Sequence, residues 1–126
     1  MKEFMLLIRN GIDSKKTFSP ELDQAFLKAC EVYIERLNEN GSLKKAQPMI
    51  REGRMVSNAG GVWQDSPFNE AEEVIVGYYH ILANDIDEAI AIARGNPEFE
   101  YTTTARIEVR PLKMKEVTTD YIYPNK

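Results

Sequence analysis

The residues with the clearest capacity for chemistry lie where an acidic motif runs into an apolar segment. The motif is Asp65-Ser66-Pro67-Phe68, and the segment, residues 74–82, carries the only histidine of the chain, His80. An imidazole changes charge near neutral pH without special perturbation. If His80 faces a cleft, it can act as a general acid or base; otherwise it is a packed imidazole with one hydrogen bond.

Asp65 has two interpretations. An aspartate that opens a proline-containing turn accepts backbone N–H bonds and fixes the turn, and this role alone explains the residue types. The functional alternative is a carboxylate held at the mouth of a cleft as a base or ligand contact, with Phe68 of the same motif as a further ligand contact. The catalytic candidates are therefore His80 and Asp65.

Three more side chains are candidates for ligand binding. Arg9 ends the first apolar segment, and its planar guanidinium suits a substrate carboxylate, although a salt bridge to Asp13 or a dimer contact explains it equally well. Tyr78 and Tyr79 must point to opposite faces of a strand. We expect one of them to pack under the helices and the other to face a cleft or a partner subunit.

No motif indicates a metal or a cofactor. Glu70, Glu72 and Glu73 cluster beside the motif, but acidic residues near a turn usually form a solvated surface, and no histidine or cysteine spacing supports zinc. The sequence contains no G-x-G-x-x-G, P-loop or G-x-S-x-G pattern. We therefore expect neither a metal site nor a bound cofactor.

The composition is that of one ordinary globular domain. The chain has 126 residues, of which 43% are hydrophobic and 29% charged, and a formal charge of −4. This acidic balance gives no broad positive field for a phosphate backbone, so we expect no nucleic-acid partner. Cys30 is the single cysteine, which fits a reducing compartment. Because the N-terminal apolar run is short, we expect a cytoplasmic protein that binds no membrane.

Strand and helix signals alternate along the chain. The expected elements are a strand at 4–8, a helix between Ser19-Pro20 and Asn40-Gly41, a hairpin or meander within 43–64, a strand at 74–82, a helix capped by Asp85 and a strand at 105–110. This βαββαβ order with an extra hairpin predicts an α+β, ferredoxin-like fold. In that fold an antiparallel sheet carries two helices on one face.

The strands at 4–8 and 74–82 are apolar on both faces, so we expect them side by side in the middle of the sheet. Two helices cover only one face, and a second copy packing sheet against sheet is the simplest cover for the other. We assign residues 1–112 to the domain and residues 113–126 to a C-terminal tail. In the tail, Tyr121-Ile122-Tyr123 either adds an edge strand or is disordered.

Several motifs in this order resemble the YCII-related family that carries a DGPF motif. They are Phe4-Met5-Leu6-Leu7-Ile8-Arg9, Ser19-Pro20-Glu21, Asn40-Gly41-Ser42-Leu43, Asp65-Ser66-Pro67-Phe68, Gly77-Tyr78-Tyr79, Asp87-Glu88-Ala89 and Ile107-Glu108-Val109-Arg110-Pro111. The resemblance covers about residues 3–112. It implies a dimeric α+β barrel of two ferredoxin-like subunits with a cleft between sheet and helices. Ser66 stands where the motif has glycine, and Glu72 where lysine is common.

The preferred hypothesis is a homodimer with a small-ligand cleft lined by Arg9, Asp65, Tyr78 or Tyr79, and His80, and with acid/base enzyme activity. The alternative is a non-catalytic interaction or regulatory module that assembles through its sheet face and its tail. A haem-handling role, as in other dimeric α+β barrels, would rest on fold analogy alone. The sequence identifies neither a substrate nor a reaction.

Overall fold

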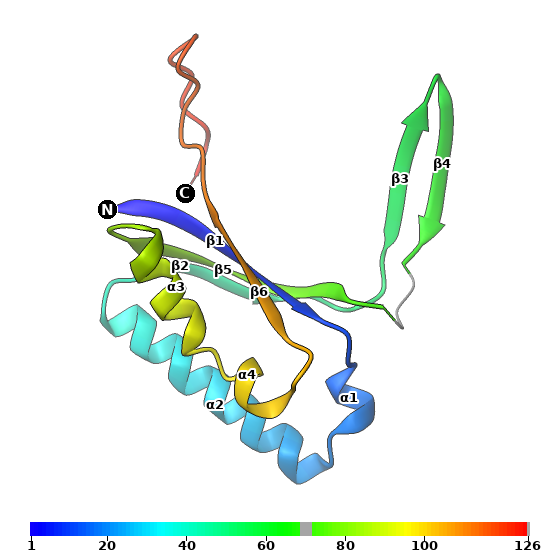
Figure 1. Cartoon of the computed structure of the whole chain (residues 1–126), viewed down its shortest axis with the longest axis vertical. Helices are drawn as coiled ribbons and strands as arrows, with labels where there is room; N and C mark the ends of the chain where they lie inside the picture. The colour runs from blue at the N-terminus through cyan, green and yellow to red at the C-terminus, as the bar shows by residue number, and fades with distance from the viewer. Residues whose placement is uncertain (69–71, 126) are drawn as a thin grey trace.

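A computed structural model of the chain describes residues 1–68 and 72–125. Figure 1 shows its elements, which are β1 (Lys2–Asn10), α1 (Ser14–Thr17), α2 (Pro20–Glu39), β2 (Leu43–Pro48), β3 (Arg54–Ala59), β4 (Val62–Pro67), β5 (Val74–Ala83), α3 (Ile86–Arg94), α4 (Glu98–Tyr101) and β6 (Arg106–Pro111).

The main sheet has the strand order β2-β5-β1-β6, and its neighbouring strands are antiparallel. Both long helices, α2 and α3, lie on one side of it (Figure 1). This α+β arrangement is compatible with a ferredoxin-like fold. The prediction that the strands at 4–8 and 74–82 lie side by side is confirmed, because β1 pairs with β5 from Lys2–Ala83 to Asn10–Val74.

Alternation along β1 separates the two faces of the sheet. Phe4, Leu6 and Ile8 are buried toward the helices, and Asn10 continues this row at 2% exposure. The core also contains Tyr33 and Leu37 of α2, Tyr79, Ile81 and Ala83 of β5, and Ala89 and Ala93 of α3. We call the other side the open face; it carries Met5, Leu7 and Arg9 of β1, Tyr78 and His80 of β5, and Glu108 and Arg110 of β6.

Local signals fix the helix ends as the sequence predicts. The Ser19 side chain accepts a hydrogen bond from the Leu22 amide at 3.1 Å, and α2 is followed by Gly41 at φ 71°, a left-handed conformation that suits glycine. The Asp85 side chain caps α3 by accepting from the Glu88 amide at 2.8 Å. These local features define where the two helices begin and where α2 ends.

Strands β3 and β4 form a separate hairpin, which we call the β-arm. The sequence predicts a turn at Asp65-Ser66-Pro67-Phe68, but this is wrong in part, because β4 continues through Pro67. Phe68 follows the strand, and residues 69–71 of the expected acidic turn lie outside the described residues. The reversal of the β-arm instead occurs at Gly60 and Gly61, both at positive φ.

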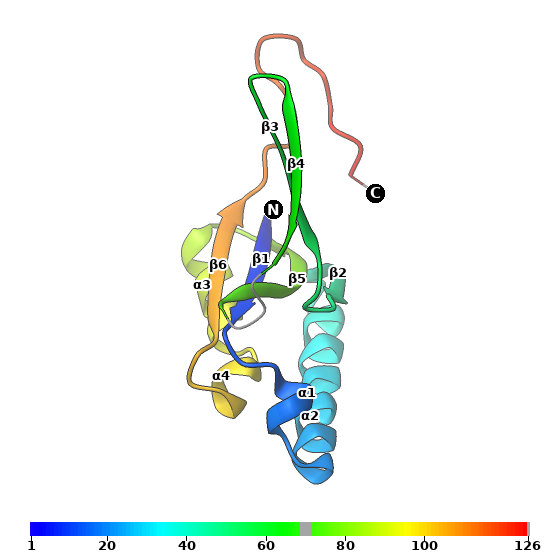
Figure 2. The same cartoon turned by 90° about the vertical axis from the view of Figure 1, so that its right-hand side faces the viewer.

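The tail after β6 turns back on itself rather than extending the main sheet. Within the described part of the tail, its β pairing is one bridge between Lys115 and Ile122, and the rings of Tyr121 and Tyr123 lie 5.2 Å apart. Both the β-arm and the tail extend away from α2, on the side of the open face (Figures 1 and 2). In residues 1–68 and 72–125, no helix has the length and apolar character needed to cross a membrane.

Candidate functional site

The residues singled out in the sequence do not form one site. His80, Tyr78 and Arg9 lie on the open face, whereas Tyr79 is buried under the helices and Asp65 lies on the β-arm. Alternation along β5 separates Tyr78 from Tyr79, as expected. Tyr79 packs against Tyr33 of α2, with ring centroids 5.4 Å apart.

His80 has a carboxylate partner that the sequence analysis did not identify. Its Nε2 lies 2.7 Å from Oε1 of Glu3, and its side chain is only 7% exposed. The register pairs Met5 with His80, so Glu3 is the diagonal neighbour on the same face. Strand alternation together with antiparallel pairing of the two central strands was the signal that pointed to Glu3.

Glu3 also connects the sheet to the tail. Its Oε1 accepts hydrogen bonds from Lys44 Nζ at 3.1 Å and from Asn125 Nδ2 at 2.6 Å. Burial raises the pKa of Glu3, but the hydrogen bonds from Lys44, Asn125 and His80 outweigh burial and lower the pKa below its ordinary value. The carboxylate is thus kept ionised, and the end of the tail covers the pair of Glu3 and His80.

Arg9 belongs to a charge network along the open face. Its Nε donates to Glu108 at 3.1 Å, and its Nη1 lies 3.8 Å from Glu73. Glu73 also receives a bidentate pair from Arg106, whose hydrogen bonds lower the pKa of this carboxyl. Arg9 therefore forms salt bridges, but its partners are Glu108 and Glu73 rather than the predicted Asp13, and its role as a dimer contact stays a prediction.

Asp65 and Phe68 belong to the β-arm and its base. Asp65 pairs with Arg54 across the hairpin at 3.3 Å, and its side chain is 55% exposed. Phe68 packs on Gly53, where an added Cβ would lie 2.6 Å from the ring, so any larger residue would force the ring to move. Neither residue lines the cavity between the sheet and α2, and a role of either side chain in ligand binding or catalysis stays a prediction.

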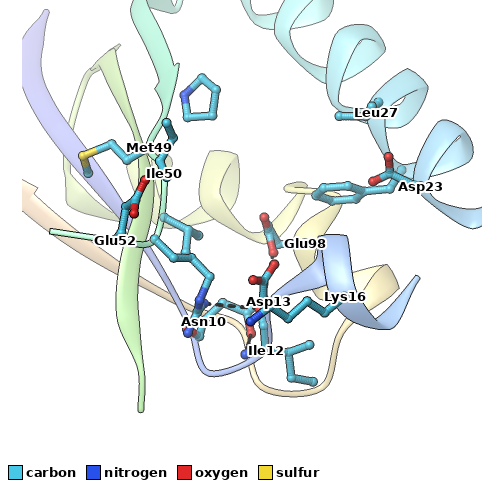
Figure 3. Close-up of a pocket in the computed structure, with 14 residues that line it drawn as sticks. Asn10, Ile12, Asp13, Lys16, Asp23, Leu27, Met49, Ile50, Glu52 and Glu98 are labelled. Carbon is cyan, nitrogen blue, oxygen red and sulfur yellow. Dashed lines mark hydrogen bonds between the residues drawn. The ribbon is translucent and has the colours of Figure 1, made fainter. Parts of the chain in front are cut away.

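A cavity of about 520 Å³ lies where α2 faces the ends of β1 and β2 (Figure 3). Its wall is lined by Asn10, Ile12, Asp13, Lys16, Asp23, Phe26, Leu27, Pro48, Met49, Ile50, Arg51, Glu52, Val76 and Glu98. Its volume falls within the range typical of small-molecule pockets, about 300–1,000 Å³.

A β-bulge helps to shape this cavity. The register of β1 and β5 shifts between Ile8–Gly77 and Arg9–Ile75, which leaves Val76 as the extra residue of β5. Bulges re-aim side chains and are common next to functional sites. Here the bulge coincides with a cavity wall, because Val76 lines it.

Asn10 organises the polar part of the cavity wall. Its Nδ2 donates to Glu98 Oε2 at 3.0 Å and to Thr102 Oγ1 at 3.1 Å. Its Oδ1 accepts from the Ile12 amide at 3.0 Å and from Thr104 Oγ1 at 2.5 Å. The whole amide is therefore in use, and it holds the Glu98 carboxyl in a fixed orientation.

Glu98 is the acid that the cavity itself perturbs. Burial raises the pKa of Glu98, and the hydrogen bond from Asn10 offsets this effect only in part. Such a carboxyl can hold or release a proton closer to neutral pH than an ordinary glutamate. The sequence analysis missed this group, although alternation from Phe4, Leu6 and Ile8 already placed Asn10 on the helix side.

The comparisons place the chain in a family without specifying a reaction. A search of curated proteins finds no significant match. The profile of the YCII-related domain, in contrast, matches residues 3–113, which is nearly the whole chain. The protein therefore belongs to the YCII-related domain family.

Proposed function

We propose that the protein binds a small molecule in the cavity between α2 and the sheet and handles a proton there through Glu98. The observation that carries this proposal is the fixed Asn10–Glu98 pair in the wall of a cavity of about 520 Å³, half of whose lining residues are apolar. In this proposal the acid/base role first considered for His80 and Asp65 belongs to Glu98. His80 is instead enclosed with Glu3 under the tail.

The test is a metabolite screen read by amide chemical-shift changes in the intact chain. We expect a ligand to shift the resonances of Ile12, Val76 and Glu98 together. Leu27→Trp should fill the mouth of the cavity and abolish the response, because Leu27 lines it from α2. Leu22→Trp is the matched control, since Leu22 lies on the same helix and is likewise exposed, but does not line the cavity. Equal binding to both variants would contradict the proposal.

We propose further that the protein is a homodimer whose subunits meet through the open face. The β-arm supports this proposal, because it exposes Met55, Val56, Val62 and Trp63, at 59–72% of their surface. A two-stranded hairpin is at best marginally stable in water, so this one requires a packing partner. The open face carries both arginines and glutamates. Across a two-fold axis, the arginines of one copy can pair with the glutamates of the other.

Light scattering of the wild-type protein at micromolar concentration should give the mass of a dimer. Trp63→Glu should shift the population toward monomer, because a charge at this exposed aromatic disrupts packing against the partner without disturbing the protein's own core. Leu22→Glu should remain dimeric, because α2 lies on the opposite side of the sheet from the open face. A monomeric wild-type protein would rule out this assembly.

A further inference from the structure

The charges around the cavity are strongly unequal. Four acidic side chains, Asp13, Asp23, Glu52 and Glu98, line it together with two basic ones, Lys16 and Arg51. Arg51 Nη1 donates to the carbonyl oxygens of Asn10 at 2.9 Å and Ile12 at 3.3 Å, and Nη2 donates to that of Glu72 at 3.1 Å. Its guanidinium thus ties the chain segments of the wall together.

Glu98 is only half satisfied within the wall. Its Oε2 accepts from Asn10, and no donor to Oε1 is recorded among residues 1–68 and 72–125. A desolvated carboxylate held by a neutral amide gains strongly from a charged donor. Figure 3 shows Glu98 reaching into the space between α2 and the chain that follows β1.

An aromatic ring lines the same cavity as this carboxyl group. Phe26 lines the cavity, and its ring lies 5.3 Å from that of Tyr101, which belongs to the same short helix as Glu98. A carboxylate and an aromatic ring in one cavity favour an ammonium group, because the ammonium pairs with the acid and is attracted by the ring. Among residues 1–68 and 72–125, no group of three or more histidine, cysteine, aspartate or glutamate side chains is placed to hold a metal ion.

We infer that the cavity selects a small organic cation, an amine whose ammonium group pairs with Glu98 and whose apolar body packs on Phe26 and Leu27. This inference rests on the proposed ligand-binding function. The ammonium donates to the free oxygen of Glu98, while Asn10 keeps the other oxygen in place. An anionic ligand would instead be repelled, because acidic side chains outnumber basic ones two to one in the wall of the cavity.

The test compares three probes with one carbon skeleton: cyclohexanemethylamine, cyclohexanemethanol and cyclohexanecarboxylate. In chemical-shift titrations of the intact chain at pH 7.5, the amine should bind about tenfold more tightly than either other probe. Glu98→Gln should remove this preference, since the amide keeps the shape but not the charge. Glu100→Gln, on the exposed side of the same helix, should keep it.

The amine affinity should also rise with pH. Burial raises the pKa of Glu98, so at low pH the amine must displace a proton, and this requirement disappears once the carboxyl is ionised. The other groups near Glu98 are Cys30 of α2 and Tyr79 of β5, together with Asp13, Asp23, Lys16 and Arg51 of the wall. Cys30 stays neutral in this range, because burial raises its pKa to about 11.

The outcomes separate the inference from the function on which it rests. Equal binding of the three probes, tighter binding of the carboxylate, or an unchanged preference in Glu98→Gln would overturn the cation assignment and leave the ligand cavity standing. If none of the three probes shifted the resonances of Ile12 and Val76, both the cation assignment and the cavity's proposed function would be wrong.

Discussion

The two faces of the main sheet hold their polar groups in opposite ways. On the helix side, Asn10 is 2% exposed, and its neutral side-chain amide donates hydrogen bonds to Glu98 and Thr102. On the open face, Arg9 is directly adjacent in sequence, yet it pairs with Glu108 and Glu73 at sites where about a third of each side chain remains exposed. Strand alternation alone separates these two environments.

This difference determines what each face can do. Charge pairs near water are screened and easily exchanged, so the open face suits contact with another subunit. Around Asn10 the polar groups are bonded to one another, so the loss of one partner affects the others. On the helix side burial raises the pKa of Glu98, whereas on the open face hydrogen bonds from charged partners lower the pKa values of Glu73 and Glu108.

Truncating these two neighbouring residues should give the largest contrast. Asn10→Ala removes the partner of Glu98, Thr102, Thr104 and the Ile12 amide, and should lower the free energy of unfolding by about 2–4 kcal/mol. Arg9→Ala should lower it by less than about 1 kcal/mol, because the pair is partly exposed. Urea unfolding at one fixed protein concentration measures both. Similar losses for the two variants would contradict the distinction between the faces.

Most of the fold could be predicted because its signals are local. The caps at Ser19 and Asp85 are set within three residues of the groups they bind, and the two central strands are marked by continuous apolar runs. The hairpin reversal at Gly60-Gly61 is equally local. The end of β4 was misplaced because Pro67 suggested a turn, whereas proline is also tolerated at the end of a hairpin strand.

The site was harder to predict because it is assembled from distant parts of the chain. Asn10 and Glu98 are 88 residues apart, and Glu3 and Asn125 are 122 residues apart. Neither pair follows from local pattern, since both depend on strand register and on the course of the segments after α3 and β6. His80 attracted attention because it is the only histidine in the sequence. The cavity, in contrast, is lined by residue types that occur many times in the chain, so none of them stands out in the sequence.

A second contrast concerns the tail, which Glu3 holds against the open face. The pKa of Glu3 is lowered because hydrogen bonds from Lys44, Asn125 and His80 outweigh burial, so its stabilising effect is present above the ordinary value near 4.5 and is lost as the pH falls through the lowered value. Glu3→Gln should weaken the contact by about 1 kcal/mol at neutral pH. Trypsin should then cleave after Lys115 several-fold faster.

Acidifying the wild-type protein below pH 4.5 should loosen the same contact, seen as line narrowing of the Asn125 side-chain amide resonance. Glu39→Gln at the exposed end of α2 serves as the control and should leave tail cleavage unchanged. If Glu3→Gln were cleaved at the wild-type rate, the tail would be held by other contacts.

The smallest effect, and the one with the opposite sign, is expected at Glu98. Burial raises its pKa, so the folded protein prefers the protonated form, and the wild type loses stability as the pH rises from about 4.5 through the raised value. Glu98→Gln keeps an acceptor for Asn10 but has no charge to desolvate. It should match the wild type at pH 4 and be more stable at pH 7.5, by less than about 1 kcal/mol. The two urea midpoints should separate between these pH values, while Glu100→Gln tracks the wild type throughout. A constant difference across the range would mean that the Glu98 carboxyl is as well solvated as the glutamates of the open face, and the contrast between the two faces would then lie in packing alone.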